Sequence, residues 1–174
     1  MATVVANYLK HNTVKVGEGR EVDEYIIPRF DHTIPAINLV NIYGEQEGRT
    51  PADDVEKGWL RLKLDITEIE ARNEAVIVMG DMNRSIGSGT HGIKDNKQKI
   101  YKGGDMIREF VKDNSYTILN NMDTAKDGPW TWVDRQNGQT KSWIDIVLAS
   151  NCLLPYESMV WIDRERKFRP RRVM

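Results

Sequence analysis

The first third of this chain alternates short apolar runs with polar stretches, a pattern typical of β-strands. Apolar runs at residues 4–9, 14–16 and 22–27 predict three short strands, and residues 16–19 (VGEG) have the composition of a turn. Residues 36–43 (AINLVNIY) predict a longer strand. Its apolar and polar side chains alternate imperfectly, which indicates burial on both faces of a sheet.

Helical periodicity begins after Thr50. Apolar residues recur at spacings of three and four, namely Val55, Trp59, Leu62, Ile66 and Ile69. We expect Thr50 to cap this helix, with Pro51 in the first helical position. Asp53 and Asp54 would then lie at the positive end of the helix dipole.

A second helix and further strands follow. We expect Asp105 to cap this helix, whose apolar face comprises Met106, Ile107, Phe110 and Val111. Strands are predicted at residues 76–79, 116–119, 130–133 and 143–149, and residues 136–138 (QNG) predict a turn between the last two. Because several strands are consecutive, the sheets must be mixed. The order predicts an α/β protein in which two β-sheets pack together with helices outside.

Composition narrows the protein class. The chain has 174 residues, of which 40% are hydrophobic and 29% charged, so one soluble domain with a real core is expected. No apolar run is long enough to span a membrane, and the N-terminus lacks the features of a secretory signal. The single Cys152 excludes an internal disulfide and suits a reducing, intracellular compartment, the nucleus included.

Charge is unevenly distributed along the chain. The net charge is −1, so the chain as a whole is not an electrostatic nucleic-acid binder. Residues 163–174, however, contain six basic residues and only two acidic ones. This basic tail could contact phosphates, or it could be a solvated tail.

The strongest chemical signal lies at residues 76–83 (VIVMGDMN). An apolar run ends in glycine, and Asp81 and Asn83 follow two residues apart. The pattern predicts a buried strand entering a tight turn, with both side chains at the carboxyl end of the strand, where open α/β sheets place ligands. An acid that orients water beside an amide donor suits attack on a phosphodiester. A Gly-Asp turn with no chemical role is also common.

A second signal lies at residues 142–148 (SWIDIVL), where Asp145 interrupts an apolar strand. A carboxylate there is costly unless it is paired, belongs to a site, or sits at a wet strand edge. Trp132 offers an aromatic surface nearby, although tryptophans are more often core residues than nucleic-acid stackers. Tyr43 ends its strand as Asp81 follows its own, so these two side chains could converge on one sheet edge.

Four motifs occur in the order found in the endonuclease/exonuclease/phosphatase superfamily. They are Ile-Tyr-Gly closing a strand, G-D-M-N, Thr-Trp, and S-W-I-D-I-V-L-A-S. The chain thus resembles DNase-like nucleases, and its last two motifs look most like the endonuclease domains of non-LTR retrotransposons. The resemblance covers roughly residues 36–162, and the chain looks truncated at both ends. It implies a single but partial domain over residues 1–174, built as a four-layer sandwich.

The resemblance also implies residue roles. Asp81 resembles the residue that orients or deprotonates the attacking water, and Asn83 the amide that contacts the scissile phosphate. Both are also the candidate ligands of Mg²⁺ or Mn²⁺. Tyr43 resembles the tyrosine that hydrogen-bonds the phosphate, and Asp145 the carboxylate that orients a catalytic histidine. Ser142, Trp132 and Arg84 are candidate substrate contacts. The implied reaction is metal-assisted phosphodiester hydrolysis, with DNA favoured over RNA. Inositol-phosphate phosphatases and sphingomyelinases of the same superfamily are alternative functions that these motifs leave open.

Departures from the family pattern leave the activity open. The family's metal-binding Glu and its closing Asp-His pair are not visible here, and His11, His32 and His91 all precede Asp145. The chain could be a nuclease-like domain with reduced or no activity, a scaffold that binds or assembles with a partner, or half of a site completed by another chain. We also expect exposed strand edges at residues 37–39 or 144–147, which would favour an oligomer or a larger assembly.

Overall fold

The computed structural model describes residues 13–18, 24–30, 33, 35–44, 50–84, 86, 102–121, 132–133, 141–142 and 144–155. In chain order the elements are β1 (Thr13–Glu18), β2 (Glu24–Phe30), β3 (Ile37–Tyr43), α1 (Ala52–Glu70), β4 (Ala75–Asp81), α2 (Lys102–Asp113), β5 (Tyr116–Ile118), the 3₁₀ turn η2 (Leu119–Asn121), β6 (Trp132–Val133), β7 (Lys141–Ser142), β8 (Asp145–Ser150) and the 3₁₀ turn η3 (Asn151–Leu153). The predicted strand at 4–9 and the basic tail lie outside the described residues.

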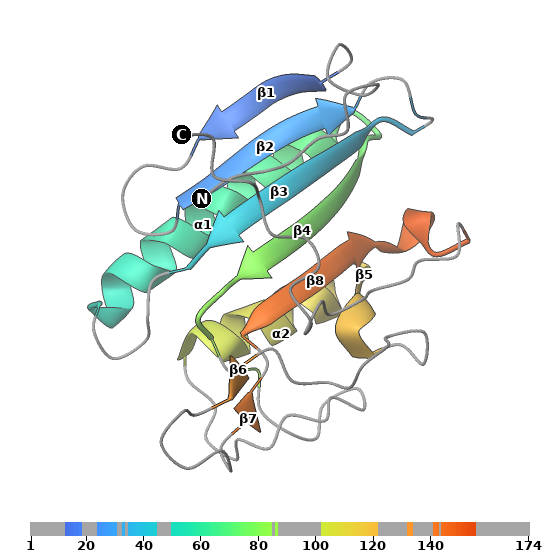
Figure 1. Ribbon diagram of the computed structural model, residues 1–174. Coiled ribbons are helices and arrows are strands. Elements are labelled where there is room, and N and C mark those ends of the chain that lie inside the picture. Colours follow the sequence, from blue (N-terminus) through green and yellow to red (C-terminus); the bar gives the residue numbers. More distant parts are fainter. Residues whose placement is uncertain are drawn as a thin grey trace, which may run out of the picture.

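Six strands form one large sheet in the order β1-β2-β3-β4-β8-β5 (Figure 1). β3 and β4 are parallel and are connected through α1, while the other neighbouring pairs are antiparallel. The short strands β6 and β7 form a separate antiparallel pair. The predicted α/β class with a mixed sheet is therefore confirmed.

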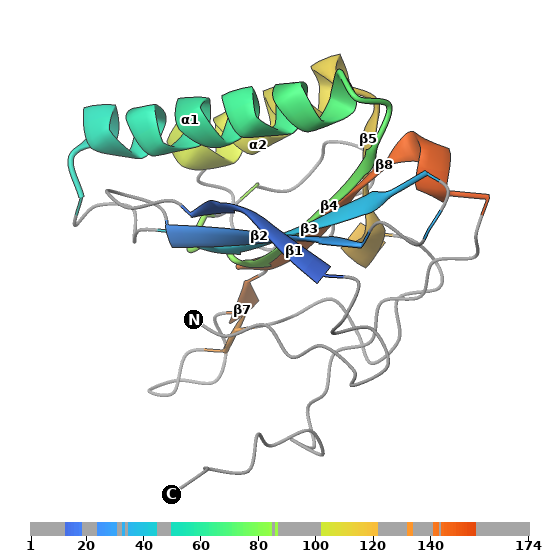
Figure 2. The same ribbon diagram turned by 90° about the horizontal axis from the view of Figure 1, so that it is seen from above.

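Figure 2 shows α1 and α2 together on one face of the large sheet, with β7 on the opposite side. This layer of helices on a sheet corresponds to one half of the sandwich predicted from the sequence, and β6–β7 is the second sheet of the described part. Within the described residues, no helix is long and apolar enough to span a membrane.

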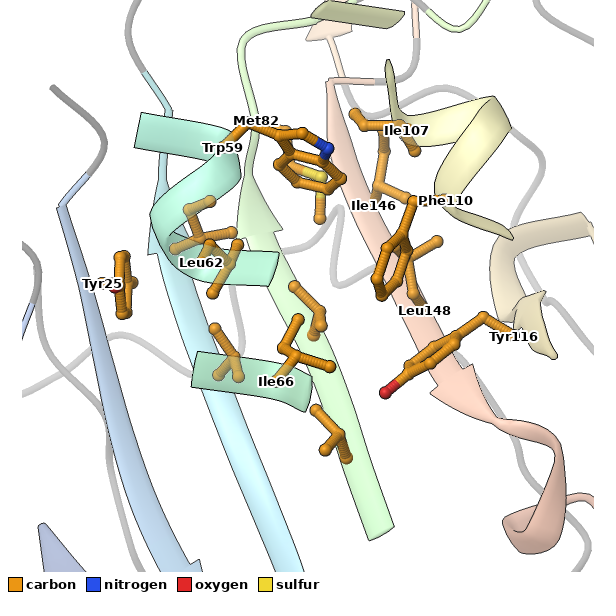
Figure 3. Close-up of a cluster of buried hydrophobic side chains, with 14 of the residues drawn as sticks. Tyr25, Trp59, Leu62, Ile66, Met82, Ile107, Phe110, Tyr116, Ile146 and Leu148 are labelled. Atoms are coloured by element: carbon orange, nitrogen blue, oxygen red, sulfur yellow. The ribbon is translucent and has the colours of Figure 1, made fainter. Parts of the chain in front are cut away.

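The core lies between the helices and the sheet (Figure 3). All five apolar residues predicted for α1 are buried, and Trp59 meets Phe110 of α2 edge to face with ring centroids 5.6 Å apart. The sheet side of the core is formed by Tyr25, Ile27, Val40, Ile42, Val76, Val78, Tyr116, Ile118, Ile146 and Leu148. Burial alternates along β3, so one face of this strand meets the helices and the other is only partly covered.

Local predictions at several element ends are wrong. Residues 16–18, which were predicted to form a turn, belong to β1. The register between β1 and β2 shifts between Lys15 and Glu18, so Gly17 lies in an irregular part of the strand. Pro51, not Thr50, is the N-cap of α1, because the Pro51 carbonyl accepts the first amide bonds. α2 begins three residues before Asp105, which instead lies in the first turn and pairs with Arg108 at 2.9 Å.

Long-range pairing also differs from the prediction. β6 pairs with β7, whereas residues 145–150 enter the large sheet beside β4. The turn expected at residues 136–138 lies outside the described residues. β8 lies between β4 and β5, and β3 lies between β2 and β4. The predicted exposed edge at residues 37–39 is therefore wrong, because β2 and β4 pair with β3 on its two sides. Residues 145–147 pair with β4 on one side and lie beyond the last register pair of β5 on the other. The edge strands of the described sheet are β1 and β5.

A polar cluster closes the end of the sheet where β3 and β4 begin. Glu74 accepts bonds from Arg29 Nε at 3.1 Å and from the buried Asn38 Nδ2 at 2.9 Å, and it lies 3.4 Å from Arg72. The Arg29 bond is the largest of the effects that lower the pKa of Glu74 from 4.5 to about 2, against the opposing effect of burial. Glu74 therefore stays ionised in the folded protein well below the pH at which it protonates when unfolded.

This cluster predicts a defined acid sensitivity. Because the folded pKa is lowered, the stabilisation is complete above pH 4.5 and is lost as the pH falls toward 2. Glu74→Gln should reduce the free energy of unfolding at neutral pH by about 1–2 kcal/mol. It should also flatten the dependence of stability on pH across that window, which urea denaturation at several pH values would measure.

The matched control is Asp54→Asn. Asp54 forms an exposed ion pair with Lys57 at 3.3 Å, so its loss should cost less than about 0.5 kcal/mol. Equal acid profiles for the Glu74 and Asp54 variants would contradict the prediction.

Candidate functional site

Three of the predicted site residues meet in one row at the end of the sheet. Tyr43 at the end of β3 is the register partner of Asp81 at the end of β4, and Asp81 is the partner of Asp145 at the start of β8. Partners directly opposite each other on neighbouring strands share a face of the sheet. Residues of opposite parity, such as Ile42 and Ile146, lie in the core, so the row lies on the face away from the helices.

Gly80 allows β3 and β4 to approach closely one residue before the row formed by Tyr43, Asp81 and Asp145. Its φ is +137°, a conformation that side chains rarely adopt. A Cβ at this position would overlap the carbonyl oxygen of Ile42 on β3. The glycine that the sequence predicted as a turn is thus a position of close backbone contact inside β4, and Asp81 is the last residue of the strand rather than part of a turn.

A network of hydrogen bonds beyond the strand ends holds Asp81 and Asn83. The Gly44 amide donates to the Asp81 carbonyl at 2.8 Å, and Asn83 Nδ2 donates to the Gly44 carbonyl at 2.8 Å. The Asn83 amide in turn donates to Asp81 Oδ1 at 2.9 Å. Asn83 has a φ of +48°, which asparagine tolerates better than most residues. The carboxylate and the carboxamide are therefore fixed against each other.

The electrostatics of the row centre on Asp81. Burial raises the pKa of its carboxyl, the Asn83 amide partly offsets this rise, and the charge of Asp145 raises the pKa further. Asp81 is half-buried, whereas Asp145 is exposed and Tyr43 is 51% exposed. Asp145 therefore avoids the cost of burial that the sequence suggested, because it occupies the first, solvent-facing position of β8.

The predicted substrate contacts divide into two groups. Trp132 and Ser142 are direct register partners on β6 and β7, the pair that precedes β8 in the chain. Arg84 is only 1% exposed, and its guanidinium lies over the Trp59 ring at 5.7 Å. The structure thus places Arg84 in the core, where the aromatic ring favours the cation.

No protein-family model and no curated protein matches the chain. Among solved structures it is similar to a 3′-5′ exonuclease (NExo) from Neisseria meningitidis, with a TM-score of 0.59 and 17% identity, over 84% of this chain and 60% of the exonuclease. The chain therefore shares its fold with this exonuclease. The chain spans less than two thirds of the exonuclease.

A second similar structure is an endonuclease/exonuclease/phosphatase family protein from Bacteroides thetaiotaomicron. The TM-score is 0.45 at 13% identity, over 74% of this chain and 41% of that one.

The row and the neighbouring Asn83 offer oxygen donors suited to a hard cation. Mg²⁺ prefers carboxylate and carbonyl oxygens and keeps several waters. Asp81 and Asp145 supply two carboxylates, and Asn83 uses its amide nitrogen on Gly44, which leaves its carbonyl oxygen available. No group of three His, Cys, Asp or Glu side chains forms in the described part of the chain. The donor chemistry therefore fits a magnesium ion held mainly by water and these oxygens.

One residue of the site region was missed by sequence reasoning. Asn120 in η2 is 7% exposed, and its side chain bonds to the backbone of β8 beside Asp145. A Leu-Asn-Asn sequence after a short strand is ordinary turn chemistry. The role of Asn120 depends on β8 lying next to β5, a long-range pairing that no local sequence pattern indicates.

Proposed function

We propose that this chain is a metal-dependent phosphodiester hydrolase of the endonuclease type, with its site at the Tyr43–Asp81–Asp145 row. The observation that carries the proposal is the register, which brings three separately predicted side chains from three strands onto one face. Neighbouring strands lie about 4.8 Å apart. A phosphate group at the row could therefore contact more than one of these side chains at once.

Each side chain has a chemical role in this proposal. Asp81 takes the proton of the attacking water, and the Asn83 backbone amide, which donates to its Oδ1, holds the carboxylate in place. Asn83, held by Gly44, orients the scissile phosphate, and the exposed Tyr43 hydroxyl donates a hydrogen bond to a phosphate oxygen. Mg²⁺ or Mn²⁺, held by Asp81 and Asn83 with Asp145 as the second carboxylate, would neutralise phosphate charge when bound.

We propose DNA as the substrate and the non-LTR retrotransposon endonucleases as the nearest branch. The sequence motifs around Trp132 and Ser142 support this choice, and these two positions face each other on the pair leading into β8. Single nucleic-acid strands and flipped bases commonly stack on aromatic side chains. A nuclear, DNA-bound role follows from the same proposal.

A second function is favoured by the small number of acidic groups at the row. Two carboxylates meet there, and the described residues contain no group of three His, Cys, Asp or Glu side chains that could hold a metal ion. The chain would then be a scaffold that binds a partner, or it would share a site that another chain completes. Loss of one essential catalytic group commonly costs several orders of magnitude in rate.

Nicking of supercoiled DNA by the purified chain separates these functions. We expect Mg²⁺-dependent nicking that disappears with a chelator and in an Asp81→Ala variant. Parallel assays with RNA, sphingomyelin and a phosphomonoester would identify the substrate class. Equal, background-level cleavage by both proteins on every substrate would overturn the proposal and leave the scaffold role.

A further inference from the structure

β5 ends before it reaches the part of β8 that carries Asp145. Its last register pair is Ile118 with Leu148, so β5 does not extend alongside residues 145–147. Unpaired backbone groups in a sheet interior are costly unless a side chain or water replaces the missing partner.

The side chain of Asn120 replaces the missing strand. Its Oδ1 accepts the Val147 amide at 2.7 Å, and its Nδ2 donates to the Asp145 carbonyl at 3.2 Å. A carboxamide has one acceptor and a donor in the same plane, as a peptide unit has, so it can continue the ladder. With 7% exposure, the side chain has little access to competing water.

We propose that Asn120 is a positioning residue that holds Asp145 opposite Asp81. This inference rests on the proposed function of the row. The bond to the Asp145 carbonyl fixes the backbone of the residue that supplies the carboxylate, and the bond to Val147 fixes the strand two residues later. On the other side of β8, the Met82 amide donates to the Ile144 carbonyl at 2.7 Å, so the start of β8 is held from both sides.

Ser150 provides a matched control at the other end of β8. Its Oγ accepts the Val76 amide at 2.9 Å and donates to the Val76 carbonyl at 3.0 Å. Like Asn120, it is a buried polar side chain that makes two bonds to sheet backbone, but it is five residues from Asp145. Asn120→Ala and Ser150→Ala should therefore lower the urea midpoint by similar amounts, and only the first should disturb the row.

Steady-state nicking kinetics test the proposal at a temperature where both variants are folded. Asn120→Ala should lower kcat about 10- to 100-fold with little change in KM, because the catalytic group is displaced while substrate binding is retained. Ser150→Ala should stay within about threefold of the parent chain. Equal losses in the two variants, or an unchanged kcat for Asn120→Ala, would overturn the inference.

Amide hydrogen exchange gives a readout that needs no activity. Asn120→Ala should speed exchange of the Val147 amide at least about tenfold, whereas Ser150→Ala should speed exchange of the Val76 amide. Unchanged exchange at Val147 would overturn the positioning role. Faster exchange at Val147 in a chain that cleaves nothing would support the placement of Asp145 by Asn120 while refuting the proposed function.

Discussion

Gly80→Ala is expected to lose more than about 3 kcal/mol of unfolding free energy, or to fail to fold. Alanine strongly disfavours the +137° φ of this position, and its Cβ would overlap the Ile42 carbonyl oxygen. The obstacle is backbone rather than a flexible side chain, so β3 must move away from β4 at the residue before Asp81. Chemical denaturation followed by tryptophan fluorescence would measure the loss.

Gly58→Ala is the control for this prediction. Gly58 lies inside α1, where alanine is the better helix former, so stability should change by no more than about 1 kcal/mol. If the Gly80 variant were as stable as the Gly58 variant, the close approach of the two strands would not be important for the fold.

Asp81→Asn is expected to reduce nicking by about 10³-fold or more, because the amide cannot take a proton from water. The variant should nevertheless fold, since an asparagine oxygen can still accept the Asn83 amide bond now made by Asp81 Oδ1. Stability should rise by up to about 1 kcal/mol, because a half-buried charge facing Asp145 is removed. Initial nicking rates and thermal unfolding of the same preparations would measure both effects.

A loss of activity combined with unchanged or higher stability distinguishes a catalytic residue from a structural one. Asp54→Asn on the exposed surface of α1 should leave both quantities unchanged. If the Asp81 variant nicked DNA as fast as the parent chain, the cleavage would have to come from another site or from a contaminating nuclease.

The helices and most strands could be predicted from the sequence because their signals are local. The five apolar positions of α1 repeat at helical spacing and are all buried, and the apolar run before Gly80 is β4. Element ends were less predictable. The Pro51 carbonyl begins α1, although Thr50 has the side chain more typical of a cap.

The residues of the row and part of its geometry could be predicted. The ends of β3 and β4 identified Tyr43 and Asp81 and predicted that they converge on one sheet edge, and the register confirms this convergence. The interrupted apolar strand identified Asp145, but its place opposite Asp81 depends on β8 entering between β4 and β5, a long-range pairing with no signal in any one segment. The burial of Arg84 could not be predicted for the same reason, because its guanidinium lies over the ring of Trp59, which is 25 residues earlier in the chain.

The place of β8 in the sheet has a consequence for synthesis of the chain. β4 and β5 are made first, yet each pairs with β8, which comes last in the chain among the six described strands of the large sheet. Until residues 145–150 are available, two apolar strands have open edges that other chains can pair with. The segment that completes the proposed active site thus also ends the most aggregation-prone stage of folding, so chains interrupted before residue 145 should accumulate as insoluble material.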